Sequence, residues 1–90
     1  MKDLRILVTG VAGDIGFGIG KILRHHFEDC FLLGVDIDSN NPALAIFDMF
    51  KKIDHADSNT YEKNIIDLVR SMNVNLIIPT SEAEISIFWK

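Results

Sequence analysis

A chain of 90 residues is long enough for one small domain, and its 48 % hydrophobic content is typical of a folded protein rather than a disordered one. The net charge of −4 and the scattered lysines and arginines argue against a nucleic-acid surface, and no apolar run approaches the roughly 20 residues of a membrane span. The single cysteine excludes an internal disulfide, which is typical of a reducing compartment, so we expect a cytoplasmic protein. Together these features predict a single domain, residues 1–90, that binds neither nucleic acid nor membrane.

The chain begins with an apolar strand, a glycine loop and a helix. The run from Leu4 to Val8 is bounded by glycine and predicts a buried strand. Apolar residues at helical spacing then predict an amphipathic helix from Asp14 to Phe27. His25 and His26 close this helix, and since adjacent helical positions point about 100° apart, we expect a solvated helix end rather than a metal pair.

Two further strands are predicted in the middle of the chain. The apolar run from Cys30 to Asp36 predicts a buried strand with its cysteine in the core, and Met49 to Ile53 predicts a shorter one. Between them, Asn41 and Pro42 suit the N-cap and first residue of a short helix.

The second half of the chain predicts a loop, a helix, a strand and a last helix. The loop from Asp54 to Thr60 contains His55, which we expect to be solvated rather than bound to a metal. Asn59 and Glu62 resemble a capping box at the start of a helix whose apolar stripe is Tyr61, Ile65, Leu68, Val69 and Met72.

The strand from Asn75 to Pro79 is stopped by its proline. Ser81 and Glu84 then form a Ser-x-x-Glu capping box that opens a helix dense in large apolar residues. Such a helix either docks on this sheet or packs against residues outside this chain.

Strands that alternate with helices predict parallel strands joined by right-handed crossovers. The expected fold is therefore α/β, a Rossmann-like three-layer α/β/α arrangement around a mostly parallel sheet of about four strands. Its ligand edge lies at the carboxyl ends of the strands, at Thr9 to Gly16, Asp36 to Ser39 and Thr80 to Glu82.

Glycines spaced three apart follow the first strand, at Gly10, Gly13 and Gly16. Glycine lets a phosphate approach the N-terminus of a helix, and Asp36 follows about 20 residues later, where dinucleotide-binding folds place an acid. This loop resembles that of extended short-chain dehydrogenases and epimerases, which implies NAD. The alternative is that the glycines serve only tight turning and close strand–helix packing, and the carboxylate of Asp14 opposes a phosphate.

The stretch "FDMFKKIDHADSNTYEKNIIDLVRSMNVNLIIPTSEAEI", from Phe47 to Ile85, resembles the pre-ATP-grasp domain of ATP-grasp ligases. The likeness is greatest to carbamoyl-phosphate synthase large-subunit-like members, with a glycine loop, a "GVDID" strand end, a helix and "IPT-x-Glu-x-Glu" in the same order. It extends over Leu4 to Glu84.

The resemblance implies an enzyme that activates a carboxylate with ATP and Mg²⁺ for attack by an amine, with both cofactors held in later domains of a longer chain. This domain would not be catalytic alone and would form one wall of the cleft, against a downstream ATP-grasp domain and a small carboxylate or amine substrate. The residues implied to face that cleft are Gly10, Gly13, Gly16, Asp36, Asp38, Thr80, Ser81 and Glu82.

Two alternatives stay open at this point. One is the NAD-binding half of a dehydrogenase or epimerase, although Tyr61 and Lys63 lack the Tyr-x-x-x-Lys spacing of that family's catalytic pair. The other is a free-standing binding module that forms a homodimer through the apolar helix from Ile85 to Trp89.

Overall fold

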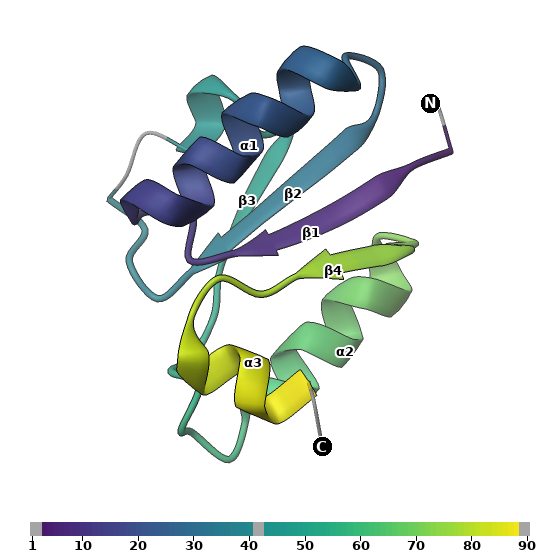
Figure 1. The fold of residues 1–90 in the computed structure, drawn as a ribbon. Helices are drawn as coiled ribbons and strands as arrows, with labels where there is room; N and C mark the ends of the chain where they lie inside the picture. Colours follow the sequence, from purple (N-terminus) through teal and green to yellow (C-terminus); the bar gives the residue numbers. More distant parts are fainter. Residues whose placement is uncertain (1–2, 41–42, 89–90) are drawn as a thin grey trace.

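A four-stranded, all-parallel sheet lies between helices in the computed structural model, which describes residues 3–40 and 43–88 (Figure 1). The strand order is β3-β2-β1-β4. The elements in chain order are β1 (Arg5–Thr9), α1 (Asp14–His26), β2 (Phe31–Asp36), a 3₁₀ turn (Ala43–Ala45), β3 (Met49–Lys52), α2 (Tyr61–Ser71), β4 (Leu76–Ile78) and α3 (Glu82–Phe88). The predicted Rossmann-like α/β fold is confirmed.

The register of the sheet brings all the carboxyl ends of the strands to one edge. Leu7 of β1 lies opposite Leu33 of β2 and Ile77 of β4, and Leu33 lies opposite Met49 of β3. Because each pair is parallel, the loops that follow β1, β2, β3 and β4 emerge side by side.

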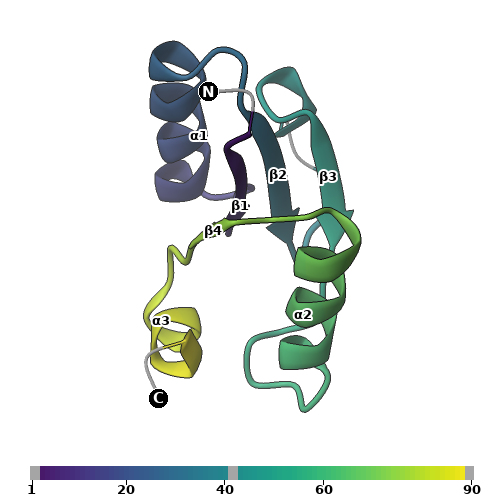
Figure 2. The ribbon, with the colours of Figure 1, turned by 90° about the vertical axis from the view of Figure 1, so that its right-hand side faces the viewer.

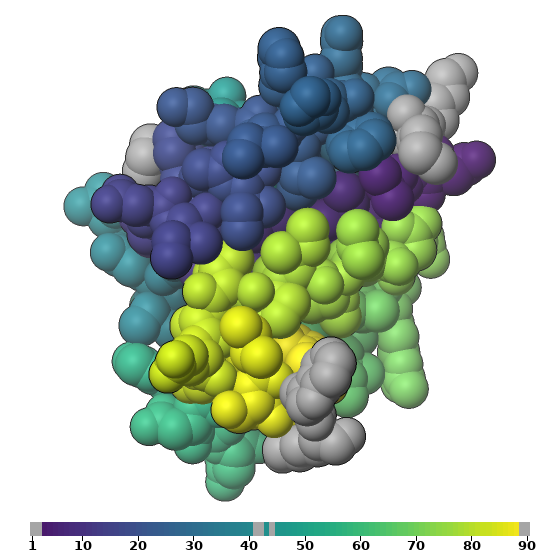
Figure 3. All heavy atoms as spheres, viewed as in Figure 1, coloured from purple at the N-terminus to yellow at the C-terminus, as the bar shows by residue number. Residues whose placement is uncertain are grey.

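Alternation along β1 divides the core between the two faces of the sheet. Ile6 and Val8 are fully buried under α1, whereas Leu7 is fully buried on the other face with Tyr61 and Ile65 of α2. Figure 2 shows α1 and α2 on opposite sides of the sheet, and Figures 1 and 2 both place α2 and α3 below β4. In the face seen in Figure 3, α1 covers the upper part and β4 with α3 the lower part.

The strands are shorter than the sequence predicted, because residues at their ends turn into the loops. Leu4 and Cys30 precede β1 and β2, and β4 contains only three residues. Cys30 is nevertheless buried as predicted, and burial raises the pKa of its thiol. The predicted cap at Asn41 and Pro42 lies outside the described residues, as does Trp89.

One of the two predicted capping boxes is wrong. Thr60, not Asn59, directly precedes α2, and no side chain caps that helix end. The reason is a local network of hydroxyls: Ser58 Oγ accepts a hydrogen bond from the Thr60 backbone N–H, and the Thr60 hydroxyl donates to Asp54. These bonds hold the loop in a turn that leaves Asn59 exposed.

The Ser81 half of the capping box predicted at the start of α3 is confirmed, whereas the Glu84 carboxylate accepts hydrogen bonds from the Ser81 and Tyr61 hydroxyls. Ser81 Oγ accepts a hydrogen bond from the backbone N–H of Glu84 at 3.2 Å. The helix docks back on the sheet through Ile87, which packs into the core shared with α2, while the Phe88 ring meets the Tyr61 ring edge to face at 6.4 Å. Within residues 3–40 and 43–88, no helix has the length and apolar character needed to cross a membrane.

Candidate functional site

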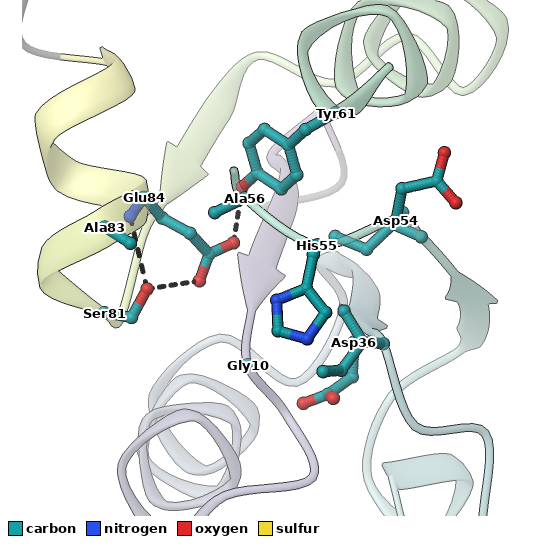
Figure 4. A pocket seen from close by; sticks show the side chains of 11 residues that line it. Gly10, Asp36, Asp54, His55, Ala56, Tyr61, Ser81, Ala83 and Glu84 are labelled. Atoms are coloured by element: carbon teal, nitrogen blue, oxygen red, sulfur yellow. Dashed lines mark hydrogen bonds between the residues drawn. The ribbon is translucent and has the colours of Figure 1, made fainter. Parts of the chain in front are cut away.

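Two adjoining hollows open at the carboxyl edge of the sheet. The glycine-loop hollow, of about 490 Å³, is lined by Gly10, Gly13, Asp14, Ile15, Gly16, Asp36, Thr80 and Ser81. The inner hollow, of about 280 Å³, lies beside it and is lined by residues that include Gly10, Asp36, His55, Tyr61, Ser81 and Glu84 (Figure 4). Gly10, Asp36 and Ser81 belong to both hollows, so three segments far apart in the sequence meet there.

The glycine loop is built by close packing. Gly10 has φ +63°, and a Cβ added there would lie 2.4 Å from Thr80 Oγ1. A Cβ on Gly16 would lie 2.3 Å from the Gly10 carbonyl oxygen, so neither position accepts a side chain. Gly13 is different, because a Cβ there would meet only that same oxygen at 3.5 Å. Close packing thus explains why glycine is needed at Gly10 and Gly16, whereas Gly13 has room for a side chain and faces the hollow.

Asp36 ties the glycine loop to the end of β2. Its Oδ2 accepts a hydrogen bond from the Ala12 backbone N–H at 2.9 Å, and its Oδ1 accepts one from the Asp38 backbone N–H at 3.0 Å. The carboxylate is therefore fixed beside the loop and faces both hollows. Asp38 lies two residues after Asp36 in the loop that follows β2. It accepts a hydrogen bond from the Asn40 backbone N–H and lines neither hollow.

Thr80 joins the end of β4 to the end of β1. Its backbone N–H donates to Thr9 Oγ1 at 2.9 Å, and its hydroxyl donates to the Thr9 carbonyl oxygen at 2.8 Å. This pair of bonds holds the β4–α3 turn against the glycine loop. Ser81 follows at the rim of both hollows, whereas Glu82 is exposed on the first turn of α3 and lines neither.

The interior contact that sequence reasoning missed joins Tyr61 to Glu84. The Tyr61 hydroxyl donates to one carboxylate oxygen of Glu84, and the Ser81 hydroxyl donates to the other at 2.9 Å (Figure 4). Tyr61 is 1 % exposed and Glu84 is 7 % exposed. Burial, followed by the hydrogen bond and charge of Glu84, raises the pKa of Tyr61. The sequence marked Tyr61 as core and Glu84 as a cap, but their pairing over 23 residues depends on how α2 and α3 pack.

The remaining polar groups give the site an acidic character. Asp36, Asp54 and Glu84 line the inner hollow and Asp14 lines the glycine-loop hollow, while no lysine or arginine is among the described residues that line either. His55 also lines the inner hollow, but its side chain is 70 % exposed and lies 3.8 Å from Asp57. Within the part of the chain that is described, no three His, Cys, Asp or Glu side chains gather as a metal site.

The arrangement can offer a ligand three kinds of contact. The first turn of α1 presents backbone N–H groups, the Ser81 hydroxyl lies at the rim, and carboxylate oxygens accept hydrogen bonds from ammonium or hydroxyl groups. Carboxylates beside a helix N-terminus weaken its attraction for phosphate, because like charges repel at short range. The site is therefore better matched to donor groups of a ligand than to a bare anion.

A parallel sheet with a glycine loop after its first strand and an acid after its second defines a Rossmann-like domain with its ligand edge at the strand ends. The chain belongs to the PylC-like N-terminal domain family, whose model matches residues 6–90. This is a pre-ATP-grasp domain of ATP-grasp ligases, as the resemblance in the sequence indicated.

Two individual proteins add to this comparison. An uncharacterized protein of Methanocaldococcus jannaschii is 48 % identical over 46 residues, a match that spans 49 % of this chain and 14 % of that protein. The crystal structure of L-threonine dehydrogenase from Clostridium difficile superimposes with a TM-score of 0.63 at 21 % identity, over 84 % of this chain and 23 % of the dehydrogenase. At that identity the likeness shows a shared fold alone, and the chain spans less than a quarter of both proteins.

Proposed function

We propose that this chain forms the N-terminal wall of the active-site cleft in an ATP-dependent carboxylate–amine ligase of the carbamoyl-phosphate synthase large-subunit-like kind. The observation that carries the proposal is the family match over residues 6–90, together with the two hollows that meet at Asp36. ATP and Mg²⁺ belong to a downstream ATP-grasp domain of the same polypeptide, and this wall contributes to holding the acceptor substrate.

The chemistry of the hollows supports an acceptor bearing an amine or hydroxyl. Asp14 and Asp36 line the hollow where a phosphate would approach α1, and their negative charges oppose it there. A substrate ammonium group meets carboxylate oxygens there instead, with favourable charge.

The first test asks whether the full-length protein activates a carboxylate. Incubation with ATP, Mg²⁺, hydroxylamine and pools of small carboxylates should yield ADP together with a hydroxamate, because hydroxylamine traps an acyl phosphate whatever its natural nucleophile. ADP formation without any hydroxamate, or neither product with any carboxylate pool, would count against the ligase.

A matched pair of variants tests whether this wall touches the acceptor. Gly13→Ala adds a methyl group at the glycine-loop hollow, whereas Gly18→Ala adds one on α1 where nothing lies within 4 Å. We expect Gly13→Ala to raise KM for the acceptor about tenfold and to leave KM for ATP unchanged, since one misplaced methyl group in a fitted site costs this much. Gly18→Ala should change neither constant.

NAD binding is the second candidate, favoured by one contact. Asp36 is held against Ala12 of the glycine loop, the position from which an acid reaches ribose hydroxyls in dinucleotide folds. A fluorescence titration with NADH separates the two proposals: saturable binding in the absence of carboxylate activation would replace the ligase by a dehydrogenase or epimerase.

A further inference from the structure

His55 is a titratable side chain of the inner hollow whose ring makes no hydrogen bond within the part of the chain that the structure describes. Its Nδ1 lies 3.8 Å from Oδ1 of Asp57, which is too long for a hydrogen bond. In Figure 4 the ring projects from the loop after β3 into the space beside Asp36. Because a neutral imidazole has one nitrogen that accepts a proton, this ring can act as a base on a ligand in the hollow.

The loop that carries His55 is anchored to two neighbouring elements. The backbone N–H of Ile53 donates to the carbonyl oxygen of Asp36 at the end of β2, at 3.0 Å. The backbone N–H of Asp54 donates to Oδ1 of Asn64 on α2, at 2.9 Å. These two bonds fix the residues directly before His55, so the fold itself places the ring at the hollow.

The other titratable groups that face the inner hollow already have hydrogen-bond partners. They come from β2, from the loop after β3, from α2 and from α3. Asp36 accepts hydrogen bonds from two backbone N–H groups, Glu84 from two hydroxyls and Asp54 from the hydroxyl of Thr60. Tyr61 donates its hydroxyl to Glu84. Among the described residues that line the hollow, His55 is therefore the group best suited to take a proton at neutral pH.

The proposed ligase reaction requires such a group. An amine attacks an acyl phosphate through its lone pair, and an ammonium group has none. The carboxylates of the hollow favour the ammonium form, because opposite charges attract. A base must therefore remove one proton before the acceptor can react.

We propose that His55 is the general base that removes this proton from the acceptor ammonium, an assignment that rests on the proposed ligase function. Nε2 of His55 accepts the proton, and the freed lone pair forms a C–N bond with the carbonyl carbon of the acyl phosphate. The C–O bond to phosphate then breaks, and the phosphate leaves with the electron pair and takes up the second N–H proton. Asp36, Asp54 and Asp57 stabilise the imidazolium, and the 70 % exposed ring passes its proton to water.

The test compares two nucleophiles on the full-length protein, with a carboxylate that yields a hydroxamate. Hydroxylamine is largely unprotonated at neutral pH and needs no base, whereas ammonium chloride supplies an ion that must lose a proton. His55→Gln should lower primary amide formation from ammonium chloride about 100-fold at pH 7, and hydroxamate formation less than about threefold. The matched control, His26→Gln, changes an exposed histidine at the end of α1 and should match the wild type with both nucleophiles.

The pH dependence of amide formation gives a second readout. Without the base only free ammonia reacts, so the rate of His55→Gln should rise about tenfold per pH unit between about pH 6.5 and 8.5. The wild-type rate should instead level off once imidazole is unprotonated. Equal losses with both nucleophiles, or a wild-type pH profile in His55→Gln, would overturn the proposal, because His55 would then act only on structure or positioning.

The wild type separates this proposal from the ligase function. If it forms no hydroxamate with any carboxylate, the ligase fails and the base fails with it. If it forms hydroxamate but no amide from ammonium chloride at any pH, the ligase function stands and His55 as the base for an amine acceptor is overturned.

Discussion

Replacing Tyr61 by phenylalanine tests the contact that joins α2 to α3. The substitution keeps the ring that packs against Leu7 and Ile65 and removes only the hydroxyl that donates to Glu84. Glu84 is 7 % exposed, so water cannot fully replace the lost donor, and its carboxylate keeps only the hydroxyl of Ser81 and its helix contacts.

The magnitude follows from the kind of hydrogen bond. A hydrogen bond to a charged acceptor contributes about 1.5–3 kcal/mol net, so we expect Tyr61→Phe to lower the free energy of unfolding by about 2 kcal/mol. For a domain of this size such a loss lowers the melting temperature by about 10 °C. The packing of the ring is unchanged, so little of the effect should come from a cavity.

The same contact makes the stability depend on alkaline pH. Burial and Glu84 raise the pKa of Tyr61 in the folded chain, whereas the unfolded chain ionises near pH 10. The tyrosine therefore contributes its full stability below pH 10 and loses it as the pH rises further, at about 1.4 kcal/mol per pH unit. The difference between the wild type and Tyr61→Phe should be constant from pH 7 to 9 and shrink by pH 11.

Urea unfolding of residues 1–90, followed by far-UV circular dichroism, measures these differences. Groups other than Tyr61 titrate equally in both proteins and cancel in the comparison. A double-mutant cycle with Glu84→Gln isolates the pairwise term. A cost below about 0.5 kcal/mol at pH 7, the level of an ordinary surface substitution, would refute the reasoning, as would a pH-independent difference up to pH 11.

Three further predictions concern packing and the loops, each read from urea midpoints. Gly20→Ala should cost about 1–3 kcal/mol because its Cβ would lie 2.4 Å from the Phe47 ring, whereas Gly18→Ala, in open space, should gain up to about 1 kcal/mol. Asp36→Ala should cost about 2 kcal/mol and speed amide exchange in the glycine loop, because two backbone N–H groups lose their acceptor. Arg24→Lys should cost about 2 kcal/mol, since an ammonium group cannot reproduce its contacts with three backbone carbonyls and a carboxylate.

Each of these predictions has an outcome that contradicts it. Equal midpoints for the two glycine variants would mean that the Phe47 ring moves aside without cost. Unchanged loop exchange in Asp36→Ala would mean that the carboxylate does not hold the glycine loop. If Arg24→Lys unfolds at the same urea midpoint as the wild type, the guanidinium contacts make no net contribution to the free energy of unfolding.

The sequence by itself determined the layout of the fold, because that layout depends on local patterns. Apolar runs and helical spacing identified four strands and the order of the helices, and alternation of the two required parallel crossovers. The sequence alone placed Gly10 and Asp36 at the same edge of the sheet, because the carboxyl ends of parallel strands lie side by side. The ordered motifs were enough to identify the pre-ATP-grasp family.

Only the tertiary structure decided which of these residues meet and what occupies their hydrogen bonds. The Thr80 hydroxyl donates to the Thr9 carbonyl oxygen, and both carboxylate oxygens of Asp36 accept hydrogen bonds from backbone N–H groups. Residue type alone therefore could not tell how many hydrogen bonds these side chains can still make to a ligand. The partnership of Tyr61 with Glu84 also has no local signature. Such contacts depend on the packing of segments far apart in the chain, where burial and geometry, rather than sequence spacing, select the partner.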